Sequence, residues 1–164
     1  MKRSDLYKKL RDVAKAKITD LAYVDLQKQQ MKKIADTNPI PLPALLIEFK
    51  DARFSNVAKL DQLGDKTISL YLYLDFVTDS FDGAESENDS IALLDKMDEI
   101  FQTFQGVSCE LFSQLIRVSE GIQEYGTGYI CFRTDFSTSV KDIKEVTKIR
   151  VTIPPININT SSNG

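Results

Sequence analysis

The chain has 164 residues, of which 42% are hydrophobic and 27% charged, a balance typical of one globular domain. It contains no histidine, which excludes histidine-activated serine or cysteine nucleophiles and zinc sites with an imidazole ligand. Its two cysteines cannot form a four-cysteine metal site, and a net charge of -3 provides no general basic field for nucleic acid. The composition alone does not indicate what the protein does, but it argues against catalysis, and we expect no metal and no cofactor.

The first predicted element is an amphipathic helix that starts at Ser4, a good N-cap, with Asp5 in its first turn. Acidic residues interrupt its basic side, which favours a helix packed on a core over a helix on a membrane surface. The N-terminus lacks the apolar segment of a secretory signal, so we expect a soluble domain made inside the cell. The predicted buried side carries apolar residues at three- and four-residue steps: Leu6, Leu10, Val13, Ala14 and Ile18.

Strands are predicted for the next part of the chain. A short strand is expected to begin at residues 21–24, and the prolines within 38–43 exclude a helix there. The apolar run 44–49 indicates a buried strand, whereas the polar segment 51–66 indicates a connecting loop or a short hairpin arm. Polar and apolar residues alternate over 67–77, the clearest strand signal in the chain, with one side formed by Ile68, Leu70, Leu72, Leu74 and Phe76.

A second helix is predicted after an acidic, turn-rich loop at residues 78–88. Asp89 or Ser90 is expected to cap this helix, and Gly106 is well placed to end it. Its predicted buried side consists of Ile91, Leu94, Met97, Ile100, Phe101 and Phe104.

Two further strands are predicted at residues 109–120 and 129–137, joined through Gly121, Gly126 and Gly128. These glycines resemble a phosphate-binding loop only superficially, because the last of them leads into a strand instead of a helix. Glycines that allow a tight turn are the favoured interpretation.

The order of the elements predicts an α+β fold, in which two main helices pack on a mainly antiparallel sheet of about four to five strands. We expect one domain over residues 1–139. Residues 140–164 are expected to form an extended arm that contacts a neighbouring subunit, since they carry a strand-like alternation and have no obvious place in the sheet.

The acidic loop is the first candidate for a ligand site. Its carboxylates could suit calcium or magnesium, but their spacing does not match the twelve-residue calcium loop. A solvated loop is therefore favoured over a metal site. We assign four of its residues to an interface instead: Asp79, Asp82, Glu85 and Glu87.

Other polar clusters have simple interpretations. The lysines of the first helix could touch DNA or an acidic partner, but interleaved acidic residues favour a solvated face. Two carboxylate pairs lack an enclosing site, and both cysteines lie among apolar neighbours as packing residues. The residues concerned are Lys8, Lys9, Lys15 and Lys17; Asp61 with Asp65 and Asp98 with Glu99; and Cys109 with Cys131.

Tyr71 and Tyr73 lie on the polar side of the clearest strand, where large aromatic side chains are unusual. Either a helix covers this side of the sheet, or the side meets another subunit, where tyrosine is enriched. Both tyrosines are therefore candidate interface residues.

Three segments together resemble the tail terminator, or tail completion, proteins of long-tailed bacteriophages and prophages: 43–49, 64–74 and 91–100. The resemblance covers residues 4–137 and lies in the order and pattern of elements, without a catalytic signature. In that family an N-terminal helix precedes a proline-led strand, an alternating strand, a second helix and a closing antiparallel pair. The segment after Val140 is longer than the family pattern.

The resemblance implies a structural virion protein that is assembled in the cytoplasm of a bacterial host. Such subunits form a ring, expected here to be a hexamer, at the head-proximal end of the tail tube. The ring ends tube polymerisation and joins the tail to the head connector, while genomic DNA passes through its channel without specific binding. The implied partners are other copies of the chain, the tail tube protein and the neck proteins, with no membrane.

Three alternatives to the tail terminator function remain open, one of them another virion protein. A head-completion or connector-adaptor protein also forms a ring, and a small intracellular module could bind a partner through the tyrosine face. A metal-dependent hydrolase built on the acidic loop is the third and least favoured.

Overall fold

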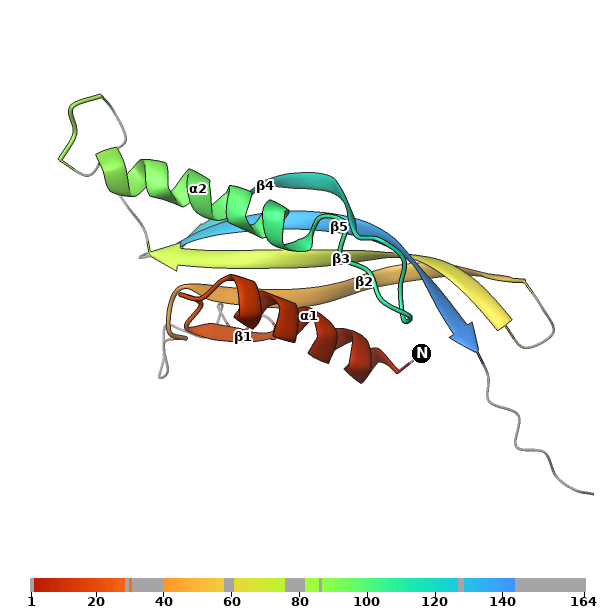
Figure 1. Cartoon of the computed structure of the whole chain (residues 1–164). Coiled ribbons are helices and arrows are strands. Elements are labelled where there is room, and N and C mark those ends of the chain that lie inside the picture. The colour runs from red at the N-terminus through yellow and green to blue at the C-terminus, as the bar shows by residue number, and fades with distance from the viewer. Residues whose placement is uncertain are drawn as a thin grey trace, which may run out of the picture.

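A computed structural model describes residues 2–28, 30, 40–57, 61–75, 82–85, 87–126 and 129–143. Two helices lie on one face of a five-stranded sheet (Figure 1), so the predicted α+β fold is confirmed. The strands are ordered β1-β2-β3-β5-β4, and only the β1–β2 pair is parallel. The elements are α1 (Arg3–Lys17), β1 (Tyr23–Leu26), β2 (Ala44–Asn56), β3 (Asp61–Asp75), α2 (Glu87–Phe104), β4 (Ile116–Gly126) and β5 (Tyr129–Ile143).

The main core lies between the sheet and the two helices. The alternation predicted for the clearest strand is confirmed, because its apolar residues from Ile68 to Leu74 are buried against the helices. The ring of Phe104 in the last turn of α2 lies 6.1 Å from that of Phe136 on β5, and both side chains are fully buried. From α1 the core receives Leu6, Leu10 and Ala14, with Ile18 just beyond the helix.

Both helices begin earlier than predicted. The N-cap of α1 is Lys2 without a side-chain cap, and Ser4 lies within the first turn. The helix α2 starts at Glu87, and two residues predicted on its buried side, Ile91 and Leu94, are 48% and 60% exposed. The side of α2 that faces the core is formed instead by Leu93, Met97, Ile100 and Phe104, which leaves Ile91 and Leu94 outside the packed stripe. Among the described residues, no helix is long and apolar enough to cross a membrane.

The β2–β3 hairpin is much longer than predicted. Its strands pair as far as Asn56 and Gln62, with an irregularity between Phe49 and Ala52, so most of the segment expected to be a loop is strand. Conversely, the strand predicted from Cys109 begins only at Ile116.

The glycines expected in the next turn lie partly in strands. Gly121 and Gly126 are both within β4, and Gly128 lies outside the described residues. The domain boundary expected after residue 139 falls inside β5, where Val140 is fully buried. The predicted arm therefore does not begin at residue 140, and residues 144–164 lie outside the described residues.

Gly64 allows the packing in the distal half of the β2–β3 hairpin to be tested. A Cβ atom built on Gly64 would lie 2.4 Å from Cδ1 of Phe54, whose ring covers the glycine across the strand pair. We expect Gly64→Ala to displace this ring and to lower the free energy of unfolding by about 1–3 kcal/mol in urea titrations. Gly121→Ala is the matched control, because its added methyl group would meet no atom within 4 Å. Equal stability of the two variants would contradict the close packing of Phe54.

Candidate functional site

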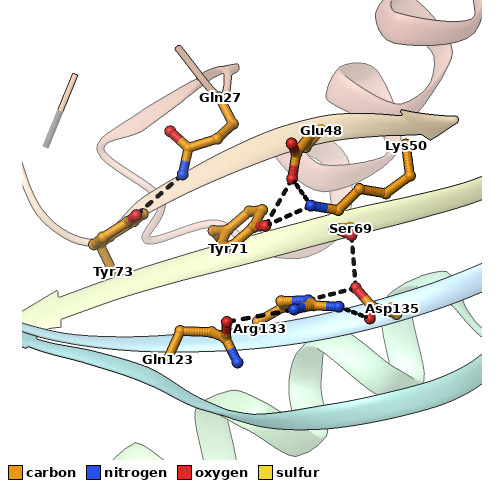
Figure 2. A network of polar contacts seen from close by, with 9 residues as sticks. All are labelled: Gln27, Glu48, Lys50, Ser69, Tyr71, Tyr73, Gln123, Arg133 and Asp135. Carbon is orange, nitrogen blue, oxygen red and sulfur yellow. Dashed lines mark hydrogen bonds and ion pairs between the residues drawn. The ribbon is translucent and has the colours of Figure 1, made fainter. Parts of the chain in front are cut away.

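The face of the sheet opposite the helices carries a polar network that joins three strands (Figure 2). The register places Ser69 of β3 between Glu48 of β2 and Asp135 of β5, and it pairs Tyr71 with Arg133. Because side chains alternate between the faces of a sheet, all of these residues point away from the helices. We call Glu48, Lys50, Ser69, Tyr71, Arg133 and Asp135 the sheet-face cluster.

The first half of the cluster consists of Glu48, Lys50 and Tyr71. The Tyr71 hydroxyl donates to Oε2 of Glu48 at 2.7 Å, and Nζ of Lys50 donates to the tyrosine oxygen at 3.2 Å. Lys50 also forms an ion pair with Glu48. Burial opposes ionisation of Glu48, but the hydrogen bonds from Lys50 and Tyr71 outweigh it and hold the pKa of Glu48 below its ordinary value.

The second half is built on Asp135, whose side chain is only 6% exposed. Its Oδ1 accepts hydrogen bonds from Oγ of Ser69 at 2.6 Å and from Nε of Arg133 at 2.8 Å. A second guanidinium nitrogen of Arg133 contacts Oδ2, so the ion pair is bidentate. Burial raises the pKa of Asp135, but the hydrogen bonds from Arg133 and Ser69 more than offset this and leave its pKa lowered.

The directions of the pKa shifts in the sheet-face cluster favour a fixed polar surface over a site of proton transfer. The pKa of Lys50 is raised, chiefly by its hydrogen bond with Glu48, and burial raises the pKa of Tyr71. With the two carboxyl pKa values lowered, these four groups titrate well away from neutral pH. The cluster is therefore a charge-balanced, preorganised polar surface whose members satisfy one another.

The two predicted interface tyrosines have different surroundings. Tyr71 is half-buried within the cluster, whereas Tyr73 is 3% exposed and therefore offers little surface to a partner. The Tyr73 hydroxyl accepts from Nε2 of Gln27 at 3.1 Å, and its ring meets that of Tyr129 at 5.6 Å. A second, smaller core surrounds Tyr73 on this face, formed with Ala44, Leu46 and Cys131.

The acidic loop is described only in part. Asp82 and Glu85 are exposed, and Oε2 of Glu87 in the first turn of α2 accepts a hydrogen bond from the backbone nitrogen of Gly83 at 3.0 Å. Asp79 lies outside the described residues. Over the described part of the chain, no group of three metal-ligating side chains comes together. The interface role of this loop stays a prediction.

Both cysteines are free thiols and pack against apolar neighbours, as predicted. Cys131 is buried in the smaller core, and Cys109 is half-buried at the edge of the main one.

Two groups of exposed apolar side chains were not identified from the sequence. The hairpin-tip group consists of Phe54, Val57 and Leu63, which are 42%, 57% and 42% exposed. The second set lies on α2 and β4 and does not form one surface, since Ile116 pairs with Ser137 on the face opposite the helices and Ile122 pairs with Phe132 on the helix-bearing face. Its members are 45–60% exposed: Ile91, Leu94, Ile116, Val118 and Ile122. Figure 1 places the hairpin tip and the first turns of α2 at opposite ends of the molecule.

The chain matches no family model and no curated protein. Its function therefore has to follow from the sequence pattern and from the surfaces described above.

Proposed function

We propose that the chain is a tail terminator subunit of a long-tailed bacteriophage or prophage. In this role it forms a ring at the head-proximal end of the tail tube, ends polymerisation of the tube and joins the tail to the head connector. The observation that carries the proposal is the exposed hairpin-tip group, together with the exposed Ile91 and Leu94 on the first turns of α2 at the opposite end of the molecule. Exposed apolar residues that gather in one place mark sites of protein–protein contact.

Two different contact surfaces suit a closed ring. If the hairpin tip of one copy meets a different surface on the next copy, the contact is heterologous, and such contacts close into a ring when the rotation allows it. The hairpin extends beyond the helix layer in Figure 1, which gives it the reach for such a contact. A ring whose two faces differ can dock on a tube with one face only, and this stops growth of the tube.

The order of elements and the net charge also support the proposal. Apart from the short β1, the chain runs helix, strand, strand, helix and closing antiparallel pair, which is the order that the resemblance implies. A net charge of -3 suits a channel through which DNA passes, because strong phosphate contacts would retain the DNA. Residues 144–164 remain the proposed inter-subunit arm.

Electron microscopy of the purified chain, with native mass determination on the same sample, tests the proposal. We expect closed rings with a central channel, either in isolation or on purified tail tubes. Leu94→Glu should abolish ring formation with an unchanged circular dichroism spectrum, since Leu94 is 60% exposed and its replacement costs little packing. Gln102→Glu, which adds the same charge at an exposed position of the same helix, should leave the rings intact.

Three results would separate the alternatives. Rings that bind the portal side and ignore tail tubes would identify a connector adaptor. A strict monomer that does not cap tubes would favour a small binding module, with the exposed part of the sheet-face cluster as its surface. Stoichiometric binding of a divalent ion that depends on Asp79 and Asp82 would instead favour a hydrolase.

A further inference from the structure

A pocket of about 470 Å³ lies between the start of α1 and the distal half of the β2–β3 hairpin. It opens on the helix-bearing face, because Lys66 lies two residues before Ile68, which faces the helices. Its lining includes Arg3, Phe49, Asp51, Phe54 and Lys66. Two aromatic rings, two cations and one carboxylate therefore surround one recess.

Lys66 is the unusual member of this lining. The residue is 7% exposed, and its Nζ lies 5.5 Å from the centre of the Phe49 ring. Within the described part of the chain, the ammonium group has no hydrogen bond and no ion pair. The side chain is enclosed, but its nitrogen reaches solvent through the pocket, since no buried side-chain nitrogen or oxygen among the described residues lacks a hydrogen-bond partner. Lys66 is therefore a cation of the pocket wall without an opposite charge bonded to it. Burial and the nearby Arg3 guanidinium accordingly lower the pKa of Lys66, with Asp51 acting in the opposite direction.

The start of α1 adds positive charge to the same pocket. Arg3 is the first residue of this 15-residue helix, whose N-cap supplies no side-chain hydrogen bond to the free amides. The N-terminus of a helix carries a partial positive charge of about half a unit. Lys50 also lines the pocket, but its ammonium group is engaged with Glu48 on the other face of the sheet. Asp51 is thus the single acidic residue in the described lining.

We propose that this pocket binds an oxyanion, a carboxylate or a phosphate group, with Lys66 as its main ligand and Arg3 as the second. A bound anion would complete the charge balance that the pocket lacks and would pair with the ammonium group of Lys66. The aromatic rings of Phe49 and Phe54 would shield the ion pair from water and so strengthen it. The pocket borders the hairpin-tip group, with which it shares Phe54, but anion binding by a single copy does not require the ring contacts.

The test is a thermal unfolding series in inorganic phosphate, with chloride at matched ionic strength and constant pH. The wild-type chain should gain several degrees in Tm at tens of millimolar phosphate, as expected for a ligand that binds only the folded state. Lys66→Met, which keeps an unbranched side chain of similar length, should fold in chloride and should lose the phosphate response. Arg3→Ala, at an exposed position, should weaken that response, while the exposed control Lys15→Met should keep it.

A wild-type chain that does not respond to phosphate or to acetate would overturn the proposal. So would an equal phosphate response in Lys66→Met and Lys15→Met, since binding would then lie elsewhere. A parallel acetate series distinguishes the two sources of the anion. A stronger response to phosphate at equal concentration identifies a phosphate site, and a stronger response to acetate identifies a carboxylate site.

Discussion

Phe104→Ala is expected to lower the free energy of unfolding by about 3–5 kcal/mol, the usual cost of removing a fully buried phenylalanine. Phe104 is 0% exposed and lies in the last turn of α2, where its ring meets Phe136 of β5. Its loss leaves a cavity at the point where α2 joins the sheet. The helix is attached to the sheet through one apolar stripe, Leu93, Met97, Ile100 and Phe104, and Phe104 is its largest fully buried member.

Urea unfolding followed by circular dichroism measures this effect. Leu94→Ala is the matched control, since Leu94 lies on the same helix but is 60% exposed, and it should change stability by about 0.5 kcal/mol or less. Similar losses for the two variants would mean that α2 is not anchored through Phe104.

Asp135→Ala is expected to lower the free energy of unfolding by about 3 kcal/mol, because it removes the buried carboxylate of a bidentate ion pair and leaves the guanidinium group without an opposite charge. Arg133 would lose both contacts to the carboxylate, and Ser69 would lose its acceptor. Asp75→Ala, at an exposed position of β3, is the control and should have little effect.

The effect of Asp135→Ala should depend on pH in a defined direction. The pKa of Asp135 in the folded state lies below its ordinary value, despite burial, because Arg133 and Ser69 stabilise the carboxylate. The carboxylate therefore contributes its full stabilisation above about pH 4, the usual pKa of an unfolded aspartate, and this is lost as the pH falls through the folded-state pKa. The stability difference between wild type and variant should shrink on acidification. A difference that stays constant down to the acid transition would contradict the ion pair.

Local patterns predicted the parts of the fold that local geometry controls. The alternation from Ile68 to Leu74 and the apolar steps of α1 identified buried sides correctly, because side-chain direction repeats every two residues in a strand and every 3.6 in a helix. The same reasoning was wrong for Ile91 and Leu94. The helix carries two neighbouring apolar stripes, and only packing on the sheet selects the one with Leu93, Met97, Ile100 and Phe104 over the one with Ile91 and Leu94.

The pattern of polar and apolar residues also did not predict the length of the β2–β3 hairpin. Its distal half is rich in polar residues and is held by backbone pairing, which leaves no periodic apolar signal in the sequence. The sequence could have indicated the position of Lys66, because Lys66 shares the alternation of Ile68 and so falls on the buried side of the strand. A lysine in that register indicates a cation on the core-facing side of the sheet.

The sequence by itself determined the α+β class, the two helices and the side of the strand from Ile68 to Leu74 that faces the core, since these depend on near-neighbour geometry. Only the tertiary structure determined which residues come together in the candidate functional surfaces. The sheet-face cluster unites Glu48, Ser69 and Asp135 because β3 lies between β2 and β5, and the anion pocket forms because α1 starts above the hairpin. Strand order and helix placement minimise the free energy of the whole chain, so no short segment encodes them.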